Sequence, residues 1–344
     1  MSLPDLDLNR RILVLYVGGT IGMRASPDGL APQRDLPAAL AAHLGPWAES
    51  LPLYSIQSAV DPIDSADAAP EDWLTIARFI AERHGRYDGF VVLHGTDTMA
   101  YTASALGFML AGIDVPVILT GAQVPLEVEG SDALENVVSA LTFAACPSLA
   151  GVGLAFDGVL YRGCRTTKVS SSDFAGFDSP NHPPIARLLP VPAMDLAALQ
   201  RPDGTEPGFT IPDHLDARVL SLRAVPGLPT AVLDAILDMA PQGLIVECYG
   251  SGTVPRLDGH MQVFLERAVR RGIVTVALSQ ALHGGIRLGA YAAGSALARA
   301  GVMDGRDMTF EAAYTKLHFL LAQDLPPVMA RTLFTRNLIG EIRD

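Results

Sequence analysis

Two threonines follow apolar stretches at places where a side-chain hydroxyl could act as a nucleophile. Thr20 follows "ILVLYVGG", and Thr96 follows "VVLHG" with Asp97 directly behind it. A threonine hydroxyl attacks poorly near neutral pH unless a neighbouring base removes its proton. These residue types therefore favour hydrolysis through a threonine nucleophile. Each motif alone also has a structural explanation, because Thr and Asp are ordinary helix N-caps and "GGT" after a strand is often a tight turn.

Lysine is almost absent from the chain, which makes each lysine a candidate for proton transfer. Lysine and arginine together number 25, yet Lys168 and Lys316 are the only lysines. Arginine cannot release a proton near neutral pH because its pKa lies above about 12. A compositional bias of the genome explains the preference for arginine in general, but it leaves open why these two amines are retained.

Motif spacing and charge argue against several other ligand classes. "GGTIG" lacks the spacing of a dinucleotide fingerprint, "GSGTVP" has proline at its third glycine position, and no phosphate-binding loop ending in G-K-[ST] occurs. No histidine pair has metal-binding spacing and no C-x-x-C occurs, so we expect no metal and no cofactor. The formal net charge of −12 disfavours nucleic acid and membrane surfaces as partners. A small molecule is the expected partner.

The chain is expected to work in the cytoplasm. No apolar run approaches the roughly 18 residues of a membrane span. The polar start "MSLPDLDLNRR" does not have the pattern of a secretory signal. The 344 residues include three cysteines, an odd number that is typical of reduced thiols rather than of a disulfide framework.

The sequence predicts an α/β fold whose strands would position these groups. Continuous apolar strands between helices indicate a mainly parallel sheet flanked by helices. Asp132 and Glu135, at the start of the last helix of this half, have capping-box spacing. In the first half the expected strands lie at 11–19, 88–95, 115–121, 151–156 and 159–163, and the expected helices at 70–85, 96–112 and 131–145.

A second, smaller α/β unit follows a stretch rich in proline and turn residues. Its expected strands, at 217–222, 243–248 and 273–278, are separated by helical patterns and favour a second parallel sheet. The expected organisation is a larger N-terminal domain at 1–190, a linker at 191–215 and a C-terminal domain at 216–344.

Ligands of open parallel sheets bind beyond the carboxyl ends of the strands. Thr20, Thr96 and the Gly121-Ala122 pair follow three such strands, so we expect one crevice to collect them. Thr96 and Asp97 also stand at the expected start of a helix. The free backbone N–H groups there suit a substrate carboxylate or a developing oxyanion.

Five segments together resemble the bacterial-type L-asparaginases, and most closely their cytoplasmic type I branch. They are "YVGGTIGM", "DGFVVLHGTDTMAYTASALGFML", "VPVILTGAQVPL", "SDALENVVSAL" and "LYRGCRTTKV". The likeness covers nearly the whole chain and continues through "YGSGTVP" and "DMTFEAAYTKLHFLL". It implies a two-domain α/β enzyme that hydrolyses L-asparagine to L-aspartate and ammonia without metal or cofactor.

The resemblance also implies roles for individual residues. Thr20 corresponds to the primary nucleophile, and Thr96, Asp97 and Lys168 form a second catalytic cluster. In one schedule Thr20 attacks the side-chain amide and Thr96 helps water to cleave the resulting ester. In the other, Thr96 activates the water and Thr20 acts chiefly in binding. Asp64 and Ser65 of "PIDSAD" match residues that hold the substrate's α-amino and α-carboxylate groups, and Gly19, Gly95 and Ala122 match residues that contribute through the backbone.

Members of this family assemble so that a neighbouring subunit completes each site. A homodimer is the expected minimum and a homotetramer, a dimer of dimers, is also expected. Ser251 and Thr253 of "YGSGTVP" match the neighbour's contribution.

Some positions depart from the family pattern. Leu30 stands near the place of a lid tyrosine, for which Tyr291 is one possible substitute and helix packing its alternative role. Ser65 is followed by Ala66, and no counterpart of a glutamate found in glutaminase-active relatives is evident, so we expect asparagine to be preferred over glutamine. Thr167 matches part of an activating asparagine site, but that site's arginine and cysteine are replaced by Glu247 and Ala281, so we expect no strong sigmoidal activation.

Two other functions share parts of the pattern. One is the amidotransferase subunit that releases ammonia for glutaminyl-tRNA synthesis, which normally carries an additional N-terminal domain. This chain begins close to its first strand, and its acidity disfavours tRNA. The other is a non-catalytic amino-acid-binding protein, which the retention of both threonines and of Lys168 opposes.

Overall fold

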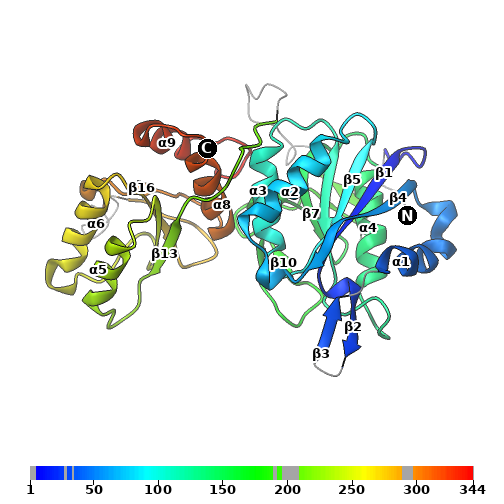
Figure 1. Ribbon diagram of the computed structural model, residues 1–344, viewed down its shortest axis with the longest axis horizontal. Coiled ribbons are helices and arrows are strands. Elements are labelled where there is room, and N and C mark those ends of the chain that lie inside the picture. Colours follow the sequence, from blue (N-terminus) through cyan, green and yellow to red (C-terminus); the bar gives the residue numbers. More distant parts are fainter. Residues whose placement is uncertain are drawn as a thin grey trace. The chain divides into compact units, whose positions relative to one another are not determined.

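The protein is described by a computed structural model over residues 5–26, 29–32, 35–188, 192–195, 209–288 and 297–343. By its internal contacts the chain divides into two compact units, Met1–Ile211 and Pro212–Asp344. Each unit combines helices with a parallel or mainly parallel sheet (Figure 1), which confirms the expected α/β fold class. The linker expected at 191–215 stays a prediction, since much of it lies outside these ranges. Within them, no helix has the length and apolar character needed to span a membrane.

The first unit is built on an eight-stranded sheet. Its strands are β1 (Arg11–Gly18), β4 (Leu53–Ile63), β5 (Gly89–Leu93), β6 (Pro116–Thr120), β7 (Gly151–Phe156), β8 (Val159–Arg162), β11 (Ala186–Arg187) and β12 (Ala193–Met194). The order is β12-β11-β8-β7-β6-β5-β1-β4. The pairs from β4 to β7 are parallel, and the pairs from β7 to β12 are antiparallel. The carboxyl ends of β4, β1, β5 and β6 therefore share one edge.

Helices cover both faces of this sheet. They are α1 (Leu36–Leu44), α2 (Pro70–Ala81), α3 (Met99–Met109) and α4 (Ala133–Ala144). α1 and α4 contact each other on one face, and α2 and α3 contact each other on the other (Figure 1). Ile12, Val14 and Tyr16 of β1 belong to the core beneath α1 and α4. β1 is at most 1% exposed from Ile12 to Val17. Cover on both faces explains why the apolar run of this strand is unbroken.

Short elements follow the carboxyl ends of the strands and contain most of the predicted site residues. After β1 come the 3-10 turn η1 (Thr20–Gly22) and the hairpin of β2 (Met23–Ser26) and β3 (Gly29–Pro32). The turn η3 (Ser65–Asp67) follows β4. After β8 the chain forms η4 (Gly163–Arg165) and β9 (Thr167–Lys168), which pairs antiparallel with β10 (Phe177–Asp178).

The second unit is a smaller sheet with helices on both faces. Its strands are β13 (Val219–Arg223), β14 (Gly243–Cys248), β15 (Val274–Ser279) and β16 (Met303–Asp304), all joined by parallel pairs in that order. Its helices are α5 (Thr230–Asp238), α6 (His260–Arg270), α8 (Phe310–Leu321) and α9 (Pro327–Phe334). α5 and α6 contact each other, as do α8 and α9. The parallel sheet agrees with the expected second α/β unit.

Candidate active site

Two glycines bring the segments of the predicted threonines together. Gly19 has a φ of 91°, and a Cβ there would lie 2.3 Å from both the backbone N and the Cα of Gly95. Only glycine allows backbones to approach this closely, and it also tolerates the positive φ. Thr20 and Thr96 each follow one of these touching glycines. The structure therefore places both threonines on adjacent connections at the carboxyl edge of β1 and β5.

Ser65 lies against the same glycine contact. A Cβ at Gly95 would lie 2.3 Å from Ser65 Oγ, and Thr98 donates a hydrogen bond from its hydroxyl to the Ser65 carbonyl at 2.8 Å. Ser65 is 4% exposed. The preceding Asp64 is exposed and accepts a hydrogen bond from the Ala66 N–H at 3.0 Å. A buried hydroxyl and an exposed carboxylate thus stand side by side at the end of β4.

Lys168 reaches this edge from the β9–β10 hairpin. Its Nζ donates to Thr96 Oγ1 at 2.8 Å and to Asp97 Oδ1 at 2.7 Å. Thr96 is 6% exposed, whereas 63% of the Asp97 side chain is open to solvent. Because the amine donates to the Thr96 oxygen, the hydroxyl proton can point to another acceptor. A hydroxyl, an amine and a carboxylate in one hydrogen-bonded row can move protons to and from a reacting group.

Thr96 and Asp97 precede the helix rather than open it. Helix α3 begins at Met99, with Thr98 at the N-cap, so the expected helix start at residue 96 was wrong by three residues. Thr96, Asp97 and Thr98 form a turn between β5 and α3. That turn lets the Thr96 and Asp97 side chains both face Lys168.

His94 supports the backbone of Gly95 and was missed from the sequence. It is 1% exposed, its Nδ1 lies 2.8 Å from the Gly95 carbonyl oxygen, and its Nε2 lies 2.9 Å from Thr102 Oγ1. Burial lowers the pKa of His94, so the ring is neutral near pH 7. The carbonyl requires a proton on Nδ1, and Nε2 then accepts from Thr102. A histidine at the end of an otherwise apolar strand was the available signal.

Asp132 holds the connection that carries Ala122. Its carboxylate accepts the backbone N–H groups of Gln123 and Val124 at 3.0 Å. The side-chain amide of Asn136 donates at 3.0 Å to both this carboxylate and the Gly121 carbonyl. The capping box expected for Asp132 was wrong, because its carboxylate bonds to the preceding connection and makes no cap bond to α4. The same residue therefore positions Ala122 at the carboxyl end of β6.

The turn that contains Thr20 rests on a tyrosine of β1. Gly22 N–H closes η1 by donating to the Gly19 carbonyl at 3.1 Å, and the Ile21 carbonyl accepts from Leu126 N–H at 3.2 Å. A Cβ at Gly22 would lie 2.1 Å from the Tyr16 hydroxyl oxygen. Burial raises the pKa of Tyr16 to about 12, which keeps its hydroxyl protonated.

Other predicted residues lie elsewhere or outside the described ranges. Thr253 closes a turn in the second unit, where its carbonyl accepts from Tyr249 N–H at 2.8 Å, and the Ser251 carbonyl accepts from Arg287 N–H at 3.1 Å. Glu247 accepts a hydrogen bond from Arg223 Nη1 at 2.8 Å. Tyr291 and the side chain of Leu30 lie outside the described residues. The neighbour role of Ser251 and Thr253 stays a prediction.

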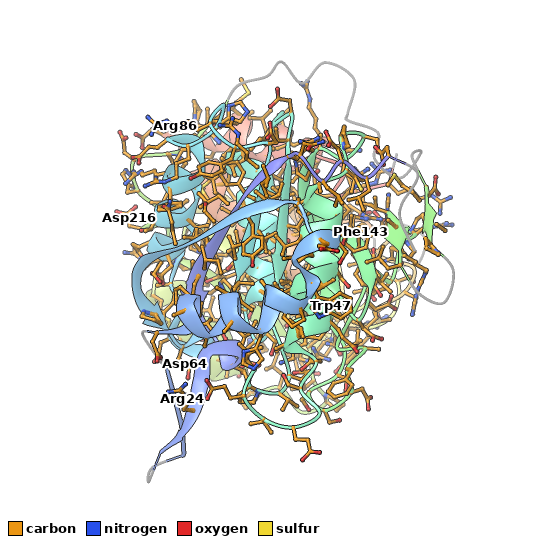
Figure 2. The ribbon with its side chains drawn as sticks, turned by 90° about the vertical axis from the view of Figure 1, so that its right-hand side faces the viewer. Arg24, Trp47, Asp64, Arg86, Phe143 and Asp216 are labelled. Atoms are coloured by element: carbon orange, nitrogen blue, oxygen red, sulfur yellow. The ribbon has the colours of Figure 1, made fainter. Side chains whose placement is uncertain are left out.

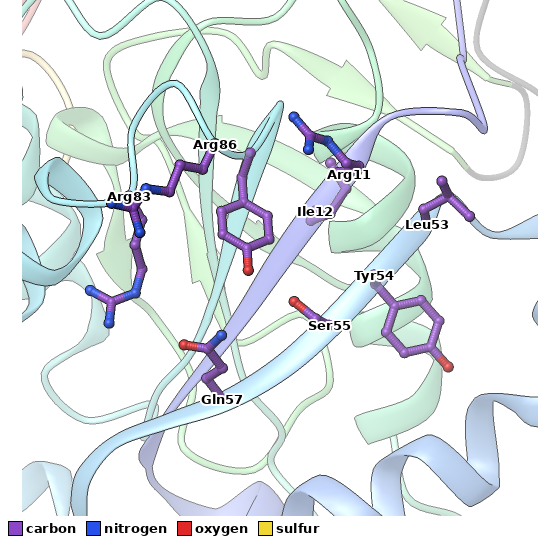
Figure 3. A pocket seen from close by; sticks show the side chains of 9 residues that line it. Arg11, Ile12, Leu53, Tyr54, Ser55, Gln57, Arg83 and Arg86 are labelled. Atoms are coloured by element: carbon purple, nitrogen blue, oxygen red, sulfur yellow. The ribbon is translucent and has the colours of Figure 1, made fainter.

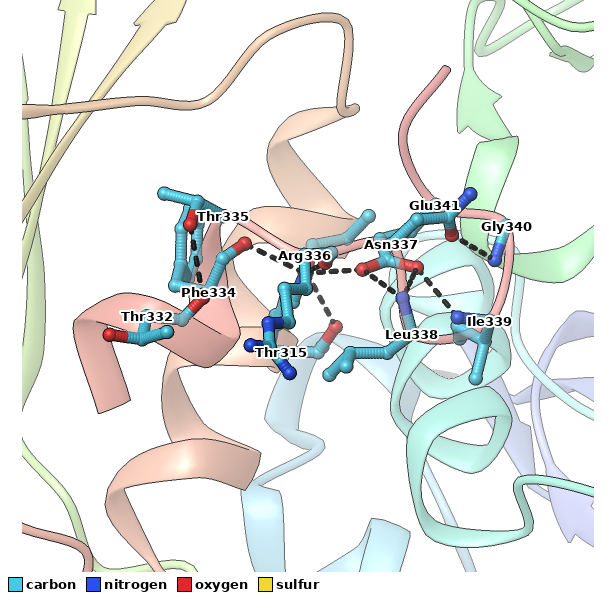
Figure 4. Close-up of polar contacts among 12 residues, drawn as sticks. Thr315, Thr332, Phe334, Thr335, Arg336, Asn337, Leu338, Ile339, Gly340 and Glu341 are labelled. Atoms are coloured by element: carbon cyan, nitrogen blue, oxygen red, sulfur yellow. Dashed lines mark hydrogen bonds and ion pairs between the residues drawn. The ribbon is translucent and has the colours of Figure 1, made fainter. Parts of the chain in front are cut away.

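The second lysine has a different environment from Lys168. Lys316 is 0% exposed, forms an ion pair with Glu341, and donates to the carbonyls of Phe334 at 2.8 Å and Arg336 at 2.6 Å. Glu341 in turn accepts N–H groups from the segment before it (Figure 4). These fixed partners suit a structural role for the Lys316 amine rather than proton exchange with a substrate.

A pocket of about 650 Å³ lies at the opposite end of the same strands. It opens near Arg11, the first residue of β1, and Figure 3 shows the arginines around it. Arg86, one of its lining residues, and Asp64 lie at opposite ends of the first unit (Figure 2). Arg11 and Arg83 already pair with carboxylates of the chain. Ligands of parallel sheets bind at the carboxyl ends, so the glycine contact remains the candidate site.

No group of three His, Cys, Asp or Glu in the part of the chain that the structure describes is arranged to hold a metal ion. The polar groups at the glycine contact are hydroxyls, one amine and carboxylates. Such groups can supply a nucleophile and exchange protons with a reacting group.

Comparison with known proteins finds matches for both units. The family model "Asparaginase, N-terminal" matches residues 11–196, and "Glutaminase/Asparaginase C-terminal domain" matches residues 218–334. L-asparaginase 1 of Escherichia coli strain K12 is 40% identical over 340 residues, 97% of this chain and 98% of that protein. The structure of L-asparaginase I from Vibrio cholerae has a TM-score of 0.87 at 35% identity, and covers 97% of this chain and 99% of its own. The thermostable L-asparaginase from Thermococcus kodakarensis has a TM-score of 0.85 at the same identity and coverage.

Proposed function

Because the chain belongs to the asparaginase family, we propose that it hydrolyses L-asparagine to L-aspartate and ammonia with Thr20 as nucleophile. The observation that carries the proposal is the Lys168 amine, 2.8 Å from the Thr96 hydroxyl and 2.7 Å from Asp97. The close contact between the backbones of Gly19 and Gly95 gives further support, because Thr20 and Thr96 are the residues that directly follow these two glycines. Both contacts support a nucleophile and a proton relay that act on one substrate.

The reaction has two steps in this proposal. The Thr20 oxygen bonds to the side-chain amide carbon, the carbon–nitrogen bond breaks, and nitrogen leaves as ammonia with the proton that the hydroxyl released. Water then attacks the aspartyl ester, which frees aspartate and returns the proton to Thr20. Thr96 orients this water, and Lys168 exchanges protons with Thr96 while Asp97 holds the amine.

The substrate is a zwitterion, and both of its charges need partners. Asp97 and Asp64 are exposed carboxylates that could face its ammonium group, and the Ser65 hydroxyl with nearby backbone N–H groups could hold its carboxylate. A charge left unpaired in the closed site would be costly. Amides without both α-groups are therefore expected to be poor substrates.

The direct test is ammonia release from asparagine by the purified protein. Thr20→Ala is expected to lower kcat about a thousandfold or more, because it removes the attacking atom. Thr75→Ala, which removes an exposed threonine of helix α2 in the first unit, is the control and should retain full activity. Full activity in Thr20→Ala would refute Thr20 as the nucleophile.

Thr96→Val separates the two catalytic schedules. If Thr96 serves the second step, the variant accumulates an aspartyl ester on Thr20, seen by intact mass as a gain of asparagine minus ammonia. If Thr96 activates water for direct attack, no such adduct forms in the variant. We expect the adduct, and expect it to be absent when Thr20→Ala is added.

Asparagine is proposed to be preferred over glutamine. If the α-groups stay fixed, the extra methylene of glutamine displaces the amide carbon by about 1.5 Å. A misplacement of about 1 Å can cost about a hundredfold in rate. Measured on both amides, kcat/KM should favour asparagine by at least about tenfold, and equal values would contradict the proposal.

We further propose that each site is completed by a neighbouring copy through Ser251 and Thr253. Thr20→Ala and the double variant Ser251→Ala/Thr253→Ala would each be impaired alone. Mixed subunits should regain activity, because one of the two sites then combines intact parts. Dimer or tetramer formation follows from sedimentation of the same samples. Lack of recovery in a verified hybrid would show that each site is built from one chain.

Two lesser proposals concern regulation and location. Glu247 already accepts a hydrogen bond from Arg223 at 2.8 Å, and its acidic side chain would repel the carboxylate of an effector. The dependence of the rate on asparagine concentration should therefore be hyperbolic, with a Hill coefficient near one.

The three cysteines are buried free thiols, which suits the reducing cytoplasm.

A further inference from the structure

We propose that Tyr16 is a positioning residue for Thr20. Its phenol stands under the turn Thr20–Gly22 and sets how far that turn lies from the sheet. The inference rests on the proposed function, since it concerns the residue to which nucleophilic attack is assigned. Tyr16 itself touches no reacting atom in this proposal and acts through the backbone of the turn.

The contact is made between a hydroxyl and a glycine. A Cβ on Gly22 would lie 2.1 Å from the Tyr16 hydroxyl oxygen and 2.7 Å from its Cζ atom. Real Cβ contacts are never this short, so the Gly22 backbone sits directly on the end of the phenol. Leu36 lies on another side, with its Cδ2 atom 3.1 Å from the same Cβ position. The end of the turn therefore cannot sink toward the core while Tyr16 occupies this place.

The hydroxyl of Tyr16 has no evident role in stability. Tyr16 is 0% exposed, and among the described residues its hydroxyl has no hydrogen-bond partner. A buried polar atom without a partner is unfavourable, and phenylalanine would fill the ring's space without this cost. A buried hydroxyl retained under a functional turn calls for an explanation beyond packing. Its length supplies one, because the oxygen is the atom on which Gly22 rests.

The rest of the turn is already fixed at its other points. Gly19 is pressed against Gly95 at the start, and the Ile21 carbonyl accepts from Leu126 N–H at 3.2 Å in the middle. Tyr16 supplies the third support at the end. Thr20 lies between these supports, so removal of one of them tilts the turn and moves the Thr20 hydroxyl relative to the substrate amide.

The first experiment compares Tyr16→Phe with Tyr54→Phe. Tyr54 lies on β4 and packs against the same core, so it is a matched loss of a phenol hydroxyl away from the turn. For Tyr16→Phe we expect kcat on asparagine to fall at least about tenfold with KM changed less than about threefold. The melting temperature should stay or rise, because an unpartnered hydroxyl is removed. Tyr54→Phe should keep kcat within about twofold of the parent. A wild-type kcat in Tyr16→Phe would overturn the inference.

The second experiment uses the glycine side of the contact. Gly22→Ala should lower kcat at least about a hundredfold, because the new methyl collides with the hydroxyl. Tyr16→Phe added to Gly22→Ala should then raise kcat, because the added methyl gains part of the space that the hydroxyl vacates. The same substitution thus lowers kcat in one background and raises it in the other. Equal loss from Tyr16→Phe in both backgrounds would refute a direct contact between Tyr16 and Gly22 as the cause.

Thr20→Ala measured alongside separates this inference from the proposed function. If Thr20→Ala is inactive and Tyr16→Phe has a normal kcat, only the positioning role of Tyr16 is refuted. If Thr20→Ala is fully active, the nucleophile assignment fails first, and a role for Tyr16 in placing that nucleophile fails with it.

Discussion

At the scale of residues, the two lysines show how the same side chain serves different ends. Both amines lie within hydrogen-bond distance of a carboxylate. Lys168 keeps 21% of its side chain exposed and also reaches the Thr96 hydroxyl, whereas Lys316 is fully buried among carbonyls. The rarity of lysine in the sequence marked both residues for attention. Only their surroundings distinguish the two amines: that of Lys168 can exchange protons with the candidate site, whereas that of Lys316 holds the C-terminal segment in place.

Lys168→Arg tests whether a positive charge at this position is sufficient for ammonia release from asparagine. Arginine keeps the positive charge beside Asp97 but cannot release its proton. If Lys168 relays protons to Thr96, kcat should fall about a hundredfold or more, the usual size of a proton-transfer contribution. Ammonia release from asparagine measures it, with Lys168→Met as the variant that loses the charge as well. An arginine variant with more than about a tenth of the parent activity would contradict a relay.

At the scale of elements, the strands that end at the site were predictable from the sequence. β1, β5 and β6 are buried on both faces, so their apolar runs are unbroken, and glycine or threonine stands at one end of each. Helix α2 begins at Pro70, the first residue of the helix expected at 70–85. β4 was missed, because it is the edge strand and its sequence "LYSIQSAVDPI" mixes polar and apolar residues. α1 was missed as well, since its alanine-rich "LPAALAAHL" has little amphipathic contrast.

The contacts of the site itself were not predictable from residue patterns. Lys168 is 72 residues from Thr96 and meets it only because the short β9–β10 hairpin bends over the carboxyl edge of the sheet. That grouping came from resemblance to a family. The role of Asp132 was misjudged for a related reason, since helix-cap spacing and a bond to the preceding connection look alike in sequence.

The close contact between Gly19 and Gly95 gives a prediction at this scale. Gly19→Ala should lower the free energy of unfolding by about 2 kcal/mol or more, from backbone strain at positive φ and collision with Gly95. It should also abolish ammonia release. Gly45→Ala is the matched control, because Gly45 has a helical φ of −48° and an added Cβ meets nothing within 4 Å. Alanine there should be neutral or stabilise by about 0.5 kcal/mol. Urea unfolding followed by circular dichroism compares the two.

At the scale of the whole molecule, the second unit contains ionisable groups that most cores avoid. Helix α8 carries both Lys316, paired with Glu341, and His318, which is 3% exposed. Both tryptophans, Trp47 and Trp73, belong to the first unit, so their fluorescence reports unfolding of that unit alone. Amide hydrogen exchange along α8 reports the second unit separately.

Acid should weaken the second unit through His318. Burial lowers the pKa of His318 from 6.5 to about 4. Between these values the unfolded chain binds a proton that the folded state excludes, so stability is complete above pH 6.5 and falls as the pH drops toward 4. The slope should approach about 1.4 kcal/mol per pH unit. Protection of the α8 amides from hydrogen exchange, followed against pH, measures this slope. His318→Gln should flatten the dependence of protection on pH. Replacement of the exposed His43 by Gln should leave that dependence unchanged. A slope unchanged in His318→Gln would contradict this origin.

Removal of one partner of the buried Lys316–Glu341 ion pair should lower the stability of the second unit more than removal of both partners. Lys316→Met leaves the Glu341 carboxylate buried without its cation and should lower the free energy of opening of α8 by about 3–5 kcal/mol. Glu341→Gln likewise leaves the Lys316 amine buried without its carboxylate and should cause a similar loss. The double variant should recover part of the loss, because no uncompensated charge remains. Additive losses in this double-mutant cycle would mean that the two groups do not interact.

The anchoring of Lys316 has a consequence for how the protein is made. The carboxylate that neutralises this amine is encoded 25 residues later, at Glu341, and so leaves the ribosome after α8 and α9 have emerged. Until then, a second unit that closed its interior would enclose the Lys316 ammonium group without the carboxylate that neutralises its charge. We therefore expect this unit to complete its folding only after Glu341 has been translated, whereas the described core of the first unit ends before residue 200.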